Sequence, residues 1–214
     1  MNTVPPTTFN DTLLALDTSG PRLQLALLAD GEVVSHCQDI AKGHAEILFD
    51  RVQKLLQANQ KTYQDLGKIA VTTGPGSFTG LRIGIAAARG FGLALKRPVI
   101  GVPNLLALSL NRQGQDFFVV VDARRNQYYV QGFAAPGNPN APPHLLEKEQ
   151  LQGKLQGKLQ GKLQHETVLS NPRIDIEKMA VFAAGVEGQD FPPLPTYVRA
   201  ADAKPQTKLR IERA

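Results

Sequence analysis

The sequence predicts an α/β protein made of two related β-rich lobes, and three observations lead to this prediction. Short apolar runs typical of strands alternate with stretches of helical periodicity. A buried-strand pattern at Ile69 to Thr73 leads through Gly74-Pro75-Gly76 into a helical pattern over residues 77–96. An apolar strand that ends in aspartate, followed by a turn and a partner strand, occurs twice, at Leu13 to Asp17 and at Val119 to Asp122.

Within the first cycle, the predicted strands are Leu13 to Asp17, Arg22 to Ala29, Glu32 to Cys37, Ile69 to Thr73 and Pro98 to Gly101. Asp30-Gly31 is typical of a two-residue hairpin turn, and the cluster from Asp17 to Gly20 is predicted as a turn. His44 to Asn59 and Asn104 to Leu110 have helical spacing, and Ser77 is a good N-cap for the helix over residues 77–96.

In the second cycle, Phe117 to Val121 and Gln127 to Phe133 are predicted strands, and Pro136 to Pro143 is a predicted loop. A tetrapeptide repeat over Leu151 to Gln164 is interpreted as an expansion in a surface loop or frayed helix, without a function of its own. The remaining predictions are a short strand at Thr167 to Ser170, a helix at Ile176 to Gly185, the end of the ordered chain at Pro192 to Arg199, and a loose tail from Lys204.

Composition limits the function classes. The net charge of +5 comes from 24 Lys and Arg against 19 Asp and Glu, and no basic face is visible in the sequence, so direct nucleic-acid binding has weak support. A single cysteine, Cys37, excludes an internal disulfide and is typical of a reducing compartment. The first 11 residues lack the features of a secretory signal, and we expect a soluble cytoplasmic protein that does not enter the membrane.

The predicted helix over residues 77–96 carries an unusual stripe of small residues at four-residue spacing: Gly76, Gly80, Gly84, Ala88 and Gly92. Each interior glycine costs about 1 kcal/mol relative to alanine, so the stripe indicates close approach of another backbone. Arg82 and Arg89 argue against a membrane-spanning pair. The stripe therefore contacts a helix of this chain or of a partner, and the residues alone favour contact within the chain.

Asp17 and Asp122 are the best candidates for chemistry, because each ends a predicted strand beside a turn. There a carboxylate could hold a hydrated cation at a nucleotide phosphate, or simply bind its own turn backbone. The Gly74 to Gly76 loop before a helix could hold an anion, although its glycine spacing fits neither common phosphate motif. Arg124 and Arg125 could contact phosphate or remain solvated.

Other catalytic signatures are weak. His44 begins a predicted helix but Leu48 stands where a second helical metal ligand would be, so His44 is interpreted as a surface or capping residue. His36 and Cys37 are adjacent in a strand and point to opposite faces. There is no Gly-x-Ser-x-Gly nucleophile elbow.

Several motifs resemble blocks of the bacterial TsaB (YeaZ) family, whose members belong to the machinery that makes N6-threonylcarbamoyladenosine (t6A) at position 37 of tRNA. The most specific is the run Thr73 to Gly84 (TGPGSFTGLRIG). Further blocks, in the family's order, are Leu14 to Ser19, His44 to Leu48, Val120 to Arg125 and Thr196 to Lys204. The segment from Pro136 to Gln164, with its repeat, has no counterpart in the family.

The resemblance implies a fold of two RNase H-like lobes of the actin/Hsp70/sugar-kinase (ASKHA) type. The expected organisation is a flexible N-terminus over residues 1–10, an N-terminal lobe over 11–105, a C-terminal lobe over 106–203 with a loop and repeat insertion at 136–164, and a tail over 204–214.

The resemblance also implies a non-catalytic subunit that dimerises with and activates the related catalytic subunit TsaD, which transfers the threonylcarbamoyl group. TsaD holds a metal partly through a His-x-x-x-His pair, and the matching positions here are near Asn104 and Leu108. Leucine cannot bind a metal, so no metal site, no catalytic residue and no cofactor of its own are expected. ATP and the metal would belong to partner subunits.

The partners that the resemblance implies are TsaD, the ATPase TsaE, a second copy of the chain when it is alone, and tRNA through the complex. The interface is expected on the small-residue helix and comprises Gly76, Ser77, Phe78, Gly80, Leu81, Gly84, Ala88 and Gly92.

Two alternatives remain open. One is an actin-like ATPase or small-molecule kinase that binds nucleotide or phosphate through Asp17, Thr18, Ser19, Gly74, Gly76 and Asp122. The other is a glycoprotease-like peptidase, for which the sequence offers no nucleophile motif.

Overall fold

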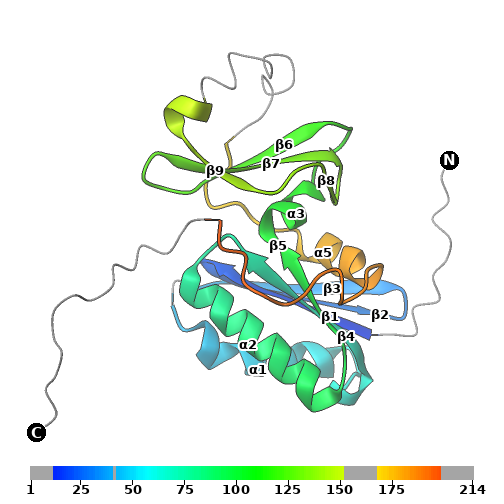
Figure 1. The fold of residues 1–214 in the computed structure, drawn as a ribbon. Helices are drawn as coiled ribbons and strands as arrows, with labels where there is room; N and C mark the ends of the chain where they lie inside the picture. The colour runs from blue at the N-terminus through cyan, green and yellow to red at the C-terminus, as the bar shows by residue number, and fades with distance from the viewer. Residues whose placement is uncertain (1–11, 41, 152–167, 199–214) are drawn as a thin grey trace, which may run out of the picture.

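A computed structural model describes residues 12–40, 42–151 and 168–198. The elements in chain order are β1 (Thr12–Gly20), β2 (Arg22–Ala29), β3 (Glu32–Asp39), α1 (His44–Ala58), the 3-10 helix η1 (Tyr63–Asp65), β4 (Leu66–Gly74), α2 (Phe78–Leu95), β5 (Val99–Pro103), α3 (Asn104–Ser109), β6 (Phe117–Asp122), β7 (Gln127–Ala135), β8 (Asn138–Pro139), β9 (His144–Glu147) and α5 (Ile176–Ala184). The described residues form a mixed α/β fold with two sheets (Figure 1).

The first sheet has the strand order β3-β2-β1-β4-β5. Strands β1, β2 and β3 form an antiparallel meander, and the connection between β2 and β3 is the predicted two-residue turn, with positive φ at Asp30 and Gly31. Strands β4 and β5 join parallel to β1 because helices α1 and α2 make the crossovers.

Alternation of side chains divides β1 between two cores. Leu14 and Leu16 point to the face that α1 and α2 cover, whereas Leu13 and Ala15 point to the opposite face. Helices α3 and α5 and the inner side of the second sheet cover that opposite face, and Figure 1 shows these layers above the first sheet.

The second sheet is built around β7, which pairs antiparallel with β6, β8 and β9. Phe117 and Phe133 of this sheet belong to the same buried cluster as Leu13 and Ala15, so the two sheets share a core. The two predicted strand–turn–strand units are both antiparallel hairpins, which confirms that the same local pattern occurs twice.

Most elements lie within a few residues of their predictions, and three differ. The predicted loop at Pro136 to Pro143 contains the short strand β8. The predicted turn at Asp17 to Gly20 is wrong: β1 continues to Gly20 with an irregular register after Asp17. In place of the strand at Thr167 to Ser170, Leu169 makes an isolated bridge to Val121, and Thr167 lies outside the described residues. Of the repeat, only Leu151 is described, and it is buried; residues 1–10 and 204–214 also lie outside.

Helix α5 qualifies the expected lobe boundary at residue 105. Although α5 comes late in the chain, its buried residues Met179, Ala180 and Ala183 pack with residues of β1 and β2. The C-terminal part of the chain therefore completes the covering of the first sheet.

Candidate functional site

A cavity of about 860 Å³ is lined by both sheets and by the first turns of α1 and α2. Its lining comes from the end of β1 and the turn that follows it, from α3, from the end of β6, and from the segment before α5. Four residues predicted to bind nucleotide or phosphate line this cavity: Asp17, Ser19, Gly76 and Asp122. The cavity thus brings together the two aspartates of the matched hairpins.

Asp17 is only 3% exposed, and three groups of the same chain donate hydrogen bonds to its carboxylate. Its Oδ1 accepts hydrogen bonds from the Ser19 N–H at 2.9 Å and the Thr72 hydroxyl at 2.7 Å. The Gln24 amide donates to Oδ2 at 3.0 Å. These bonds fix the orientation of a buried carboxylate and supply the partners that such a group requires.

Asp122 is more open and makes a turn bond. Its Oδ1 accepts from the Arg124 N–H at 2.7 Å, and after Ala123 the three consecutive residues Arg124, Arg125 and Asn126 have left-handed backbones, with φ of 62°, 54° and 58°. Such conformations cost about 1–2 kcal/mol for ordinary L-residues. The strained turn presents Arg124 to the cavity.

Thr18 and Gly74 were also predicted to contact nucleotide, but they serve the fold instead. Thr18 is fully buried and donates its hydroxyl to the Gly80 carbonyl at 2.7 Å. The Gly74 N–H donates to Oδ1 of Asn104 at 2.7 Å, and neither residue lines the cavity.

The sequence prediction missed the structural importance of Asn104. Its amide also donates to the Ser19 hydroxyl at 2.6 Å, so it ties the end of β1 to the loop before α2. A polar residue at the start of the apolar run Leu105 to Leu108 was the available signal.

His44 is not the surface or capping residue that the sequence indicated. It is buried, and its Nε2 lies 3.2 Å from the Arg22 carbonyl oxygen. Within the described ranges, no group of three or more His, Cys, Asp or Glu side chains is arranged to hold a metal ion.

The charges around the cavity are mixed. Three cationic side chains line it together with the two aspartates: Arg22, Lys42 and Arg124. Arg22 pairs with Asp39 at 3.4 Å, whereas no ion pair of Lys42 or Arg124 occurs among the described residues. The arrangement can receive an anionic group beside a buried carboxylate.

The small-residue stripe of α2 faces its own sheet. A Cβ on Gly80 would overlap the Thr18 carbonyl oxygen, one on Gly84 would overlap the Thr18 hydroxyl, and one on Gly92 would overlap the Val99 side chain. The glycines therefore let α2 approach β1 and β5 closely.

The predicted partner interface on the inner residues of α2 is accordingly wrong, because this chain already covers them: Gly80, Leu81, Gly84, Ala88 and Gly92. Gly76 is exposed but also lies against this chain, since its Cβ would come 2.8 Å from the Ser19 carbonyl oxygen. Ser77 caps α2 by accepting from the Gly80 N–H at 3.2 Å, and Phe78 is exposed.

The opposite side of α2 is uncovered. We define the outer face of α2 as its exposed residues Thr79, Arg82, Ala86, Arg89, Gly90, Leu93 and Ala94. Leu93 is 83% exposed, and a Cβ on Gly90 would meet nothing within 4 Å. Phe49 of α1, 54% exposed, extends this apolar surface and packs edge-on against Phe91 at 5.6 Å.

Helix α2 is also the one helix in the described ranges that is long and apolar enough to cross a membrane by length and composition alone. A core helix of a soluble protein meets the same criteria, and one side of α2 is packed on the first sheet.

Comparison with known proteins identifies relatives. The family model described as TsaD, tRNA N6-adenosine threonylcarbamoyltransferase, matches residues 36–142. An uncharacterized protein of Mycobacterium tuberculosis is 33% identical over 201 residues, which cover 91% of this chain and 94% of that protein.

Two named relatives align over a shorter region. The tRNA threonylcarbamoyladenosine biosynthesis protein TsaB of Bacillus subtilis is 37% identical over 122 residues, or 56% of this chain and 53% of that protein. TsaB of Escherichia coli is 32% identical over 121 residues, 55% and 52% respectively. These alignments thus span about half the length of each TsaB protein.

Among solved structures, YeaZ from Pseudomonas aeruginosa superposes with a TM-score of 0.69 at 27% identity, covering 87% of this chain and 99% of that one. A second structure, of an uncharacterized protein with similarity to the peptidase YeaZ from the same organism, superposes with a TM-score of 0.72 at 27% identity, covering 88% and 100%.

Proposed function

Because the chain belongs to the TsaB (YeaZ) family, we propose that it takes part in tRNA threonylcarbamoyladenosine biosynthesis as a non-catalytic subunit that binds and activates TsaD. In this proposal TsaE and tRNA contact the chain indirectly, through the complex, and the tRNA is modified in the cytoplasm. The two sheets represent the two lobes of an ASKHA fold, with the change of lobe near residue 105.

The residues at the positions of the TsaD metal ligands support a non-catalytic role. Both side-chain groups of Asn104 are engaged by Gly74 and Ser19, and Leu108 offers no ligand atom. The metal and the nucleotide of the reaction then belong to the partner subunits.

The single observation that carries the partner proposal is the uncovered outer face of α2. Exposed leucine and phenylalanine on adjacent helices are typical of a protein-binding surface. Ala86 and Gly90, one helical turn apart, allow the backbone of a partner helix to come close. We propose that TsaD docks here, and that a second copy of the chain docks on the same face when TsaD is absent.

Replacing Gly90 with leucine tests this contact. The side chain enters open space and the helix loses a glycine, so circular dichroism and the unfolding midpoint should stay native or rise. Its bulk should block close helix approach and weaken binding to the cognate TsaD at least about tenfold, a loss of roughly 1.4 kcal/mol. Light scattering coupled to size-exclusion chromatography measures how much of the complex with TsaD forms.

Gly84→Leu is the matched inner variant. It places the same side chain six residues earlier on the helix, against the Thr18 hydroxyl, and should destabilise the fold itself. A folded Gly90→Leu protein that binds TsaD as tightly as the wild type would contradict the proposed interface.

The cavity supports a second candidate, nucleotide binding by the chain alone, as in an actin-like ATPase or kinase. Its volume of about 860 Å³ lies within the usual range for small-molecule sites, and it joins Asp17, Asp122 and Arg124. When bound, a magnesium nucleotide would supply the phosphate and the cation. Asp17 and Asp122 would face the cation, and Arg124 would face a phosphate.

Titration of Mg-ATP into the isolated chain by calorimetry separates the two candidates. A nucleotide-binding enzyme should give measurable heat that falls in Arg124→Ala, whereas a scaffold subunit should give none. Heat that is unchanged in Arg124→Ala would remove Arg124 from the site.

A further inference from the structure

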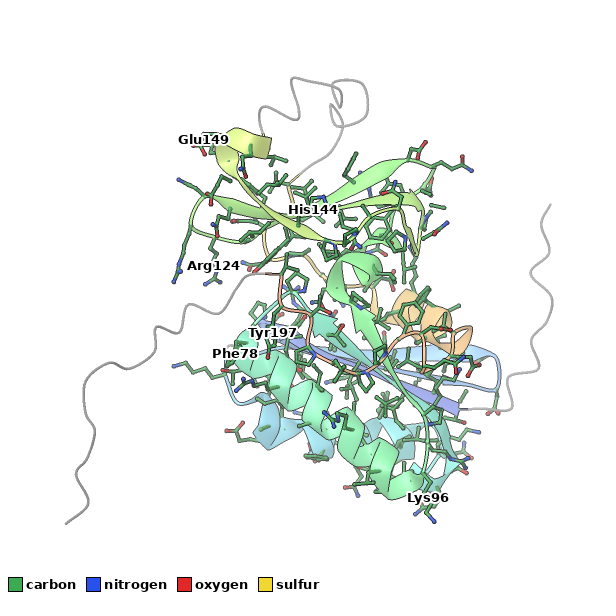
Figure 2. The ribbon with its side chains drawn as sticks, viewed as in Figure 1. Phe78, Lys96, Arg124, His144, Glu149 and Tyr197 are labelled. Atoms are coloured by element: carbon green, nitrogen blue, oxygen red, sulfur yellow. The ribbon has the colours of Figure 1, made fainter. Side chains whose placement is uncertain are left out.

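The wall of the cavity formed by the starts of β2 and α1 carries polar groups that the functions proposed above do not use. We infer that Arg22 and His44, in this wall, bind a small hydroxycarboxylate, which is a carboxylic acid anion with a hydroxyl group on a nearby carbon. The inference goes beyond the proposed function, because neither TsaD binding nor nucleotide binding assigns a part to these two residues. Arg124, which Figure 2 shows extending from the second sheet, remains available to a nucleotide phosphate.

His44 has a fixed ring with one unused nitrogen. It is the first residue of α1, is 7% exposed, and places its Nε2 3.2 Å from the Arg22 carbonyl oxygen. A carbonyl oxygen only accepts hydrogen bonds, so the neutral imidazole carries its proton on Nε2. Nδ1 is then an acceptor, and it makes no hydrogen bond to any residue that the structure describes. Because His44 lines the cavity, we assign this lone pair to a donor group of a ligand there.

Arg22 has an unused guanidinium end. Its side chain is 19% exposed and lines the cavity, and its Nε donates to Asp39 at 3.4 Å, which is long for a hydrogen bond. The two terminal nitrogens, which carry most of the N–H donors, have no partner in the described part of the chain. A guanidinium binds a carboxylate through two parallel N–H···O bonds, so this end favours a planar oxyanion.

The charges of this wall match a ligand with a single negative charge. Lys42 also lines the cavity, so Arg22 and Lys42 stand against the one carboxylate of Asp17. Asp17 needs no cation from a ligand, because three donors of the chain bind its oxygens. Asp39 is 89% exposed, so water screens its charge. A carboxylate therefore fits this wall better than a phosphate dianion.

The guanidinium end and the imidazole acceptor together define the ligand class. They belong to neighbouring groups, since His44 is bound to the backbone of Arg22 itself. A carboxylate without a hydroxyl would leave Nδ1 unpaired, and an alcohol without a carboxylate would leave the guanidinium unpaired. Unpaired polar groups in a largely buried wall cost free energy, so a ligand that satisfies both is preferred.

Titration with L-lactate and with propionate tests the inference on the full chain, because the two anions differ by one hydroxyl group. Nitrogen-15 NMR of the imidazole rings follows binding. Before titration, His44 should carry a proton on Nε2 and none on Nδ1. L-Lactate should shift the Nδ1 resonance, and should bind about fivefold more tightly than propionate, which is the ratio expected for one hydrogen bond.

Two variants separate the two contacts. His44→Gln keeps an N–H group for the Arg22 carbonyl and removes Nδ1, so it should fold like the wild type by circular dichroism and bind both anions equally. Arg22→Gln should weaken both anions about tenfold or more, since each loses a charged partner. Lys148→Gln is the matched control, because it removes a positive charge from an exposed residue outside the cavity lining, and it should change neither affinity.

Three outcomes would overturn the inference. Equal binding of L-lactate and propionate by the wild type would remove His44 from the site, and this comparison needs no variant. Tighter binding of inorganic phosphate than of L-lactate would replace the carboxylate by a phosphate ligand. Binding of none of the three anions would show that the wall is not a ligand site. These titrations use neither TsaD nor Mg-ATP, so their failure leaves the proposed subunit role and the nucleotide site to their own tests.

Discussion

At the scale of single residues, the loop before α2 depends on one amide side chain. Asn104 accepts from the Gly74 N–H and donates to the Ser19 hydroxyl, and all three residues are buried. Ser19 in turn accepts the Ser77 N–H at its carbonyl, at 2.7 Å. The start of α2 is thereby fixed to the end of β1, at the floor of the cavity.

Asn104→Ala should therefore lower the free energy of unfolding by about 2–4 kcal/mol, because a buried N–H and a buried hydroxyl each lose a partner. Urea unfolding followed by circular dichroism measures the loss. Asn111→Ala, at an exposed asparagine, is the control and should cost less than about 0.5 kcal/mol. Equal stability of the two variants would show that the loop holds without Asn104.

Residue-scale prediction from the sequence succeeded where a signal was local. Asp17 and Asp122 stood out because each ends an apolar strand, and both line the cavity. The burial of Asp17 could not be predicted, since its partners Gln24 and Thr72 reach it through strand pairing. His44 was misjudged for the same reason, because its partner carbonyl belongs to Arg22 on β2.

At the scale of elements, α2 illustrates which properties are local. Its start after Ser77 and its end before Lys96 followed from capping rules and periodicity, and both are confirmed. The neighbour of its glycine stripe could not be deduced, because small residues permit close approach by a helix and by a strand alike. The structure assigns that approach to β1 and β5, which leaves the charged side of α2 outward.

The hairpin between β6 and β7 was predicted, but the backbone conformation of its turn was not. Three consecutive left-handed residues without glycine are unfavourable, and the Arg124-Arg125 pair gave no sign of them. Figure 2 shows Arg124 above the start of α2, where Phe78 and Tyr197 lie together. The ring centres of Phe78 and Tyr197 are 6.2 Å apart, so Tyr197 lies beside the start of α2.

At the scale of the whole molecule, the repeated strand–turn–strand pattern predicted two related β-rich units, and two sheets are present. The pattern did not reveal that α5 packs on the first sheet. The helical periodicity of Ile176 to Gly185 predicts that one side of the helix is buried, but it does not predict which element that side contacts. Resemblance to a family supplied the rest of the functional prediction.

A fragment of residues 1–110 tests how far the first sheet depends on the later chain. Without α5 and the second sheet, the side of β1 and β2 that carries Leu13, Ala15, Ala26 and Leu28 would be uncovered. The fragment should therefore bind hydrophobic dyes and unfold without a cooperative transition in urea. Adding the fragment of residues 111–214 should restore cooperativity; a cooperative transition of the first fragment alone would contradict the prediction.

The position of α5 also has a consequence in time. Helix α5 begins 156 residues after β1 ends, at Ile176 against Gly20. At a synthesis rate of roughly 5–20 residues per second, α5 is synthesised about 8–30 s after β1, and until then one apolar side of the first sheet is exposed. During every round of translation the nascent chain thus exposes an aggregation-prone apolar surface. The yield of folded protein in the cell depends on whether other proteins, such as chaperones, bind that surface until α5 emerges.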